Sequence, residues 1–238
     1  MTLSRIALSF AFIFTVNSLI AQNNSTQKKK NFHKQLKETT TAQIKQLENG
    51  ALLVRLKTSQ NAISGLRARG MDKQADAVEK KQAWENQNII NAFREYYKFS
   101  PVYFFYSYDS HFIKNKSLDS VVFIDDQLHL DPSIKLNQQR FLVADFGVVE
   151  QDTATYFDHY SLQSDGNYNV KQVKNYYGGP SFGYEGLIIR SEDLIQLRHP
   201  FPYFVRTHGS DLKKKLVNRV VRKMNKKLQK FAVSMKNK

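Results

Sequence analysis

One stretch of the sequence has the spacing of a hydrolase nucleophile motif. Ser181 occupies the central position of a G-x-S-x-G pattern at residues 179–183. Asp193 and either His199 or His208 follow it, in the order that α/β-hydrolases use. A nucleophile elbow needs a strand before the serine and a helix after it. The flanking residues instead predict a loop before the serine and a strand after it, so the pattern alone does not indicate a catalytic serine.

A hydrolase stays open as the alternative function. Its groups would be Ser181, His208 and Asp145, which together with Glu150 flanks the end of a predicted strand. Such a site requires these side chains to come within hydrogen-bond reach of one another. Because no spacing in the sequence establishes this, we expect a non-enzymatic protein without catalytic residues.

The histidines and acidic residues do not have the spacing of metal ligands. The six histidines are scattered, and none lies in an H-E-x-x-H or comparable pattern. The sequence also contains no phosphate-binding loop and no G-x-G-x-x-G pattern. We therefore expect neither a metal nor a cofactor.

Aromatic residues gather in a glycine-rich loop around the serine. Their rings could stack on a sugar or another flat apolar ligand, and packing over a sheet edge explains them equally well. Both interpretations stay open. The residues of this possible ligand loop are Tyr176, Tyr177, Phe182 and Tyr184.

The net charge of +15 is concentrated near the C-terminus. Residues 213–238 contain eleven Lys and Arg and no acidic residue, whereas residues 51–212 contain 18 basic and 19 acidic residues. A basic flank on a neutral body favours attraction to an anionic surface over a positively charged catalytic cleft. We expect no nucleic-acid partner, because aromatic residues are not interleaved with the basic ones as they are in single-strand binders.

Residues 213–236 have the pattern of a helix with one apolar stripe and a basic opposite side. In one interpretation, the basic side faces anionic lipid, a glycan or an acidic protein. In the other, the apolar stripe docks on a sheet and the basic side chains are merely solvated. The contact residues of the first interpretation are Lys215, Arg219, Arg222, Lys223, Lys226 and Lys230.

The remaining periodicities predict an α+β fold, a single mixed β-sheet with a long N-terminal helix pair and the basic C-terminal helix packed on it. We expect Ser59 and Asp72 to cap the two N-terminal helices and residues 102–106 to form a central strand. Trp84 projects from the second helix, where it invites contact with a partner or with the N-terminal segment. The predicted strands are 51–57, 102–106, 121–124, 141–149, 156–162, 170–177, 187–190 and 203–207, and the predicted helices are 59–69, 72–98 and 213–236.

Residues 1–21 have the pattern of a secretory signal peptide. Arg5 supplies the basic start, an apolar run of about 15 residues follows, and Ala21 offers a small residue for cleavage. Leu19 departs from the small residue that is usual three positions before the cut. The apolar run is shorter than the roughly 20 residues of a membrane span. We expect export to the periplasm or cell surface, and the absence of cysteine excludes disulfides and thiol chemistry.

Four segments together resemble a family of uncharacterised exported bacterial proteins: residues 51–57, 101–107, 187–190 and 196–207. The leader ending at Ala21 also resembles those common in Bacteroidota. The resemblance covers roughly residues 50–231 and implies no known activity, ligand or catalytic residue.

The sequence thus predicts three regions, which are a signal peptide at 1–21, a polar basic segment at 22–50 and a single domain at 51–238. The expected function is that of a cell-envelope binding module whose C-terminal helix faces an anionic partner. We expect no transmembrane span in the mature chain.

Overall fold

We describe a computed structural model of the chain, for residues 31–32, 34–150, 155–162, 168–175, 183–209 and 211–237. For residues 155–162 and 168–175, only the backbone pairing is described. The predicted signal peptide, Ser181 and most of the possible ligand loop lie outside these residues. The chain divides into two compact units, and the larger one comprises residues 41–151 and 179–238.

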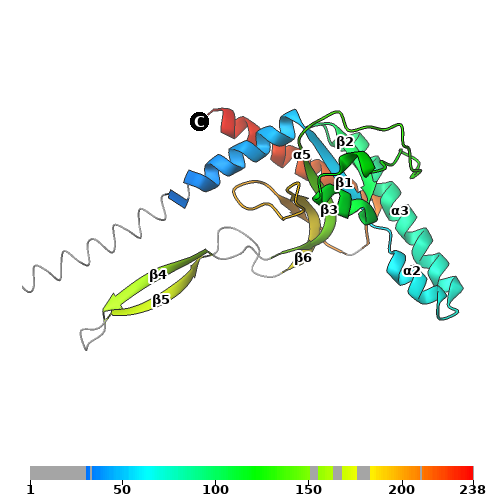
Figure 1. Cartoon of the computed structure of the whole chain (residues 1–238), viewed down its shortest axis with the longest axis horizontal. Helices are drawn as coiled ribbons and strands as arrows, with labels where there is room; N and C mark the ends of the chain where they lie inside the picture. The colour runs from blue at the N-terminus through cyan, green and yellow to red at the C-terminus, as the bar shows by residue number, and fades with distance from the viewer. Residues whose placement is uncertain are drawn as a thin grey trace, which may run out of the picture. The chain divides into compact units, whose positions relative to one another are not determined.

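The larger unit is built on a five-stranded mixed sheet, visible in Figure 1, with strand order β2-β1-β3-β6-β7. Strand β1 runs parallel to both β2 and β3. Strand β6 pairs antiparallel with β3, and β7 pairs antiparallel with β6. This arrangement confirms the predicted α+β class with a single mixed sheet. The strands are β1 (Ala51–Leu56), β2 (Val102–Tyr106), β3 (Phe141–Val149), β6 (Tyr184–Arg190) and β7 (Phe204–Arg206).

The prediction that residues 102–106 form a central strand is wrong, because β2 lies at one edge of the sheet. Its apolar side chains are nevertheless buried on both faces: Phe104 belongs to one core cluster and Phe105 to the other. The open side of the strand is covered by a bridge in which the Ile124 amide donates to the Phe104 carbonyl. Burial on two faces, rather than a central position, explains the continuous apolar run. The strand predicted at 121–124 is reduced to one bridging residue, Ile124, which pairs with Phe104 and with Leu130.

Helices cover one face of the sheet. Helix α3 (Asp72–Tyr96) and helix α5 (Lys214–Lys236) pack against each other, and Ile44 and Leu47 of helical residues 41–49 belong to the same core cluster. The shorter α2 (Gln60–Arg67) packs on α3 and extends with it beyond the sheet, as Figure 1 shows. The predicted N-terminal helix pair and the packed C-terminal helix are therefore present.

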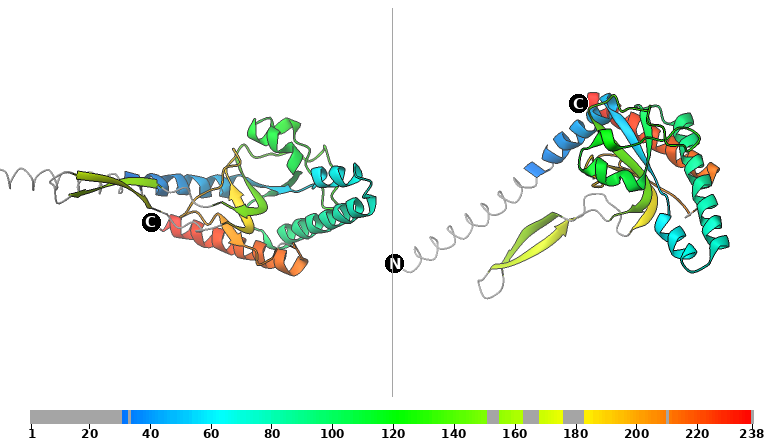
Figure 2. Two further views of the ribbon diagram at one scale, coloured as in Figure 1. Left: turned by 90° about the horizontal axis from the view of Figure 1, so that it is seen from below. Right: turned by 45° about the vertical axis from the view of Figure 1, so that its right-hand side comes forward.

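The opposite face is covered by shorter segments. Helix α4 (Ser110–Lys114) contributes Ile113 to the second core cluster, together with Val121 and Phe123 from the segment that follows. Two short 3₁₀ turns, η1 (Ser107–Asp109) and η2 (Leu118–Ser120), lie on either side of α4 in the sequence. In the left view of Figure 2, α4 lies on one side of the sheet, and α3 and α5 lie on the other. The sheet is thus the middle layer of three.

The predicted helix caps differ from those observed. Ser59 precedes α2 but has a left-handed φ of 52°, and its hydroxyl donates to the Gln82 side chain instead of capping the helix. Asp72 is the first residue of α3, and the cap position is occupied by Met71. The Ser59 hydroxyl, which the sequence pattern predicts as a cap of α2, therefore bonds to a side chain of α3 instead.

The predicted hairpin is confirmed as a separate two-stranded antiparallel sheet. Strand β4 (Thr155–Leu162) pairs with β5 (Tyr168–Asn175) along its whole length. The predicted turn between them lies outside the described residues.

Helix α5 is docked along its apolar stripe. Its buried side chains are Val217, Val220, Val221, Met224, Leu228 and Ala232, whereas Val233 is 58% exposed. This confirms the interpretation in which the stripe packs on the sheet. No helix in the described part of the chain is long and apolar enough to span a bilayer.

Leu228 provides a test of this docking. We expect Leu228→Ala to lower the free energy of unfolding by about 2 to 5 kcal/mol, because it leaves a cavity among fully buried neighbours. Val233→Ala on the same helix should change it by less than about 0.5 kcal/mol. Urea denaturation of both variants measures the difference, and equal midpoints would contradict the docking.

Candidate functional site

The predicted contact residues form one exposed basic face on α5. At 100° per residue, the six side chains fall within an arc of about 100°, centred nearly opposite the buried stripe. From Lys215 to Lys230, the face extends about 22 Å along the helix axis at 1.5 Å per residue. Each of the six is exposed: Lys215, Arg219, Arg222, Lys223, Lys226 and Lys230. Docking of the apolar stripe therefore orients the basic side chains toward solvent.

Neighbouring elements hold part of this face in position. The Arg222 guanidinium lies 4.3 Å from the centre of the Tyr96 ring on α3, and the Asn225 side chain accepts the Lys98 amide at 2.9 Å. Lys227 lies toward β7, where its ammonium donates to the Phe204 carbonyl at 3.0 Å. Burial, and secondly the charge of Lys223, lower the pKa of Lys227.

Acidic partners are scarce along α5. Among the described residues, the one ion pair of this helix joins Lys236 to Glu48 at 2.5 Å, beyond the C-terminal end of the predicted face. The nearby Asp211 carboxylate is paired with Lys81 of α3 at 2.7 Å, which lowers the pKa of Asp211. The positive charge of the predicted face is therefore not neutralised within the described fold.

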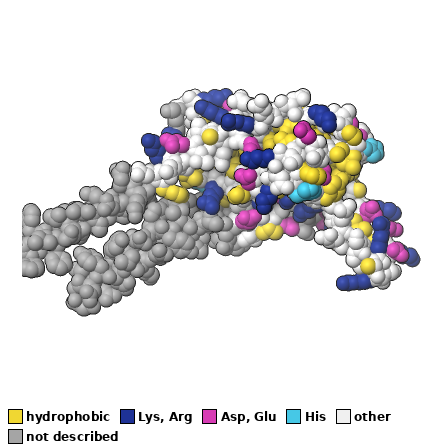
Figure 3. Space-filling view, in the orientation of Figure 1, with side chains coloured by type: hydrophobic (Ala, Val, Ile, Leu, Met, Phe, Trp, Pro, Cys, Tyr) yellow, Lys and Arg dark blue, Asp and Glu magenta, His cyan; other side chains and the backbone are white. Residues whose placement is uncertain are grey.

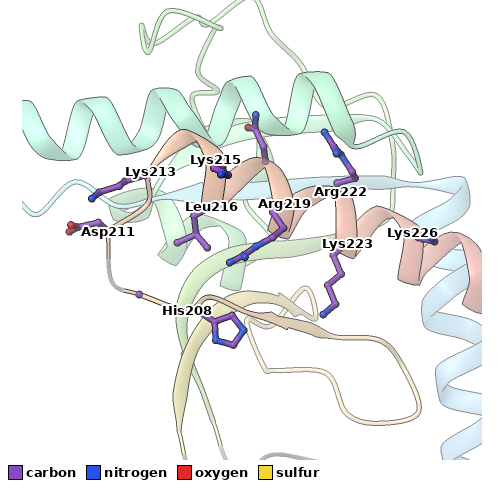
Figure 4. Close-up of a pocket in the computed structure, with 11 residues that line it drawn as sticks. His208, Asp211, Lys213, Lys215, Leu216, Arg219, Arg222, Lys223 and Lys226 are labelled. Atoms are coloured by element: carbon purple, nitrogen blue, oxygen red, sulfur yellow. The ribbon is translucent and has the colours of Figure 1, made fainter.

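Five of the six predicted residues line a hollow of about 930 Å³ between the segment after β7 and the first half of α5. In Figure 4, Arg219 and Lys223 point from the helix toward His208, whereas Arg222 points toward α3. The helix dipole adds positive potential at the N-terminal end of α5. The first turn contains no acidic residue that would offset this potential. The cationic side chains of this basic groove are Lys213, Lys215, Arg219, Arg222, Lys223 and Lys226.

On another part of the surface the charge is mixed. On the face that Figure 3 shows, Lys and Arg side chains lie among Asp and Glu side chains, including at the projecting end of α2 and α3. There Arg67 pairs with Glu79 at 2.8 Å. The basic face of α5 thus differs from this surface in carrying a single sign of charge.

Asp145, a residue of the alternative hydrolase site, lies in an ion cluster across three strands. Its side chain is 3% exposed and contacts Arg55 of β1 and Arg190 of β6, the latter at 3.1 Å. Arg190 also donates to Glu150 at 3.1 Å and to the Leu194 carbonyl at 3.3 Å. Both carboxylate oxygens of Asp145 are thus occupied by guanidinium groups, which makes it a structural anion rather than a free base.

The structure does not bring Asp145 and His208 together. Asp145 is in register with Ile188, which is in register with Phe204, and His208 follows four residues later. Strand β6 separates β3 from β7, so these two strands lie about 9.5 Å apart, and His208 lies beyond the end of β7 at Arg206. Ser181 lies outside the described residues, so the alternative hydrolase gains no support from these groups.

The possible ligand loop is described only at Tyr184. Its ring packs 6.1 Å from Phe204, and the Arg206 guanidinium lies 4.4 Å from its centre. Tyr176, Tyr177 and Phe182 lie outside the described residues. Stacking on a ligand by this loop therefore stays a prediction.

Sequence reasoning missed the ion cluster and a polar hollow at the ends of β1 and β2. The signal for the cluster was present, because Arg55 and Asp145 interrupt strongly apolar strands and Arg190 ends another. Charged residues are almost never fully buried unless they are paired. No group of His, Asp and Glu that could hold a metal was found in the described ranges.

Comparison with known proteins gave no relatives. No family model, curated protein or solved structure matches the chain. The resemblance to exported bacterial proteins stays a prediction.

Proposed function

We propose that this protein is a non-enzymatic binding module of the bacterial cell envelope whose α5 face binds a polyanion. The supporting observation is that six exposed cationic side chains share one face of a docked helix, and none of them forms an ion pair within the described residues. Such a face attracts negative charge over several ångströms at physiological salt, where the Debye length is about 8 Å.

The preferred ligand is an anionic glycan chain rather than a bilayer. Five of the cations line a hollow, which suits a chain that enters it better than a flat surface does. The guanidinium groups of Arg219 and Arg222 can each accept a carboxylate, sulfate or phosphate group in bidentate fashion. A phosphorylated or sulfated glycan presents these groups repeatedly along its length.

The cell envelope is proposed on the basis of the predicted signal peptide. If the signal is cleaved as expected, the mature protein begins at Gln22. Mass spectrometry of the protein from the periplasmic or outer-membrane fraction measures this terminus. Recovery of uncleaved chain in the cytoplasm would contradict the proposed location.

Binding to three supports distinguishes the proposed ligand from its alternatives. We expect retention on immobilised heparin, weaker salt-sensitive binding to vesicles containing phosphatidylglycerol, and no binding to neutral dextran. Elution from heparin should require salt well above physiological strength, because several cations act together. Binding to vesicles but not to heparin would indicate a membrane ligand, and binding to neutral dextran would contradict an electrostatic mechanism.

A further inference from the structure

A second hollow, of about 750 Å³, lies where β1 and β2 end beside α2 and α3. The two strands are parallel and in register, with Leu56 opposite Tyr106 at their last residues. Their carboxyl ends therefore open at the same edge of the sheet. In open sheets with parallel strands, the crevice outside this edge is the usual location of ligand sites. A volume of this size falls within the range of small-molecule pockets.

One wall of this hollow consists of amides held in fixed orientations. The Ser59 hydroxyl donates to the Gln82 side chain at 2.6 Å, and the Gln82 amide donates to Asn86 at 3.2 Å. Asn86 is only 3% exposed and donates to the Lys57 carbonyl at 2.8 Å. This chain of hydrogen bonds orients Gln82 and Asn86 before any ligand arrives.

Two tyrosines also line the hollow. The rings of Tyr106 and Tyr108 lie 5.6 Å apart with an interplanar angle of 36°. Tyr106 is anchored by its hydroxyl, which donates to the Leu128 carbonyl at 3.0 Å. Tyr108 also lines the hollow, and its large aromatic side chain is 41% exposed. An exposed, supported ring beside oriented amides is available for stacking on a flat ligand face.

The backbone at this hollow is strained in two places. Ser59 has a φ of 52°, and Leu128, which lines the hollow, has a φ of 69°. A left-handed leucine costs free energy that the surrounding structure must offset, and such residues cluster at functional sites. Ser59 bonds to Gln82 and Leu128 to Tyr106, so both residues take part in orienting side chains that line the hollow.

The charges at the hollow nearly cancel. Arg67 and Glu79 both line it and pair with each other at 2.8 Å, which leaves Lys57 as the remaining lining cation. A phosphate ligand requires more cationic groups than one lysine. Neutral amides and hydroxyls, by contrast, match ligand hydroxyl groups that both donate and accept.

From these observations we infer that the hollow at the ends of β1 and β2 binds a carbohydrate of one or two sugar rings. The apolar C–H face of a ring stacks on Tyr108, and its hydroxyl groups bond to Asn61, Gln82 and Thr58. This site is separate from the basic face of α5, and it does not depend on polyanion binding.

Saturation-transfer NMR with the full mature chain tests this inference. The probes are glucose, galactose, N-acetylglucosamine, cellobiose and maltose, each at about 10 mM, a concentration at which millimolar ligands give a signal. We expect transfer to at least one sugar. Tyr108→Ala should weaken its binding about tenfold through loss of ring stacking. Asn61→Ala should weaken it about fivefold through loss of a hydrogen bond.

Trp84→Ala is the matched control, because Trp84 is 48% exposed on α3 and does not line the hollow. It should leave sugar binding unchanged. Both Tyr108 and Asn61 are exposed, so circular dichroism should show folded variants. The inference is overturned if no sugar in the set gives saturation transfer, if adenosine binds in place of the sugars, or if Tyr108→Ala and Trp84→Ala have the same effect.

Discussion

Replacement of four basic residues of α5 by glutamine should weaken binding to heparin at least 100-fold. The variant carries Arg219→Gln, Lys223→Gln, Lys226→Gln and Lys230→Gln. Each cation near a strongly negative surface contributes about 1 kcal/mol. Four of them correspond to about 4 kcal/mol, and screening by salt reduces the expected loss to about 2.7 kcal/mol or more, which is 100-fold. Arg222 is left in place because it stacks on Tyr96.

A control variant with the same change in charge separates the face from the net charge. It carries Arg69→Gln, Lys73→Gln, Lys80→Gln and Lys135→Gln, which are exposed residues elsewhere on the molecule. Its affinity for heparin, measured by calorimetry at fixed salt, should fall less than about threefold, because distant exposed charges act only over a Debye length. Equal losses in both variants would show that total charge, rather than the α5 face, determines binding.

Asp145→Asn should lower the free energy of unfolding by about 3 to 5 kcal/mol, which is the second large effect that the structure predicts. The carboxylate lies between Arg55 and Arg190, whose side chains are 27% and 12% exposed. Removal of the Asp145 charge leaves the partly buried guanidinium groups of Arg55 and Arg190 without this anionic partner, which destabilises the folded state. In a chain of this size, the loss corresponds to about 10 °C in the midpoint of thermal unfolding.

Asp76→Asn is the matched control, since Asp76 is 58% exposed and contacts Arg67 at 3.4 Å. It should change stability by less than about 0.5 kcal/mol. The comparison also tests the hydrolase alternative. A catalytic carboxylate commonly destabilises the fold. Its replacement would therefore leave the midpoint of thermal unfolding unchanged or raise it. That result for Asp145 would contradict the structural role assigned to it.

The elements defined by strong periodicity could be predicted from the sequence. The stripe of α5 from Val217 to Leu228 predicts both the helix and its buried side, since a stripe of this width is typical of a packed surface helix. Because this stripe must face the core, the positions opposite it must face solvent. The exposure of Arg219 and Lys223 therefore followed from the pattern itself.

Features that depend on contacts between distant residues could not be predicted. The apolar run of β2 indicates burial on two faces but does not distinguish a central strand from an edge strand covered by Ile124. The Ser59 hydroxyl bonds to Gln82, 23 residues away, and so leaves its cap position without a side-chain bond. The hollow beside Tyr108 likewise combines residues from four elements, and no local pattern marks it.

The dependence of heparin affinity on salt tests the central claim most directly. The logarithm of the binding constant should fall steeply with the logarithm of salt concentration, because cations on the protein displace counterions from the polyanion. Removal of four cations from the α5 face should reduce that slope by about 3, while the control variant on the other surfaces keeps the slope of the natural protein. Identical slopes for all three proteins would contradict a polyanion-binding face on α5.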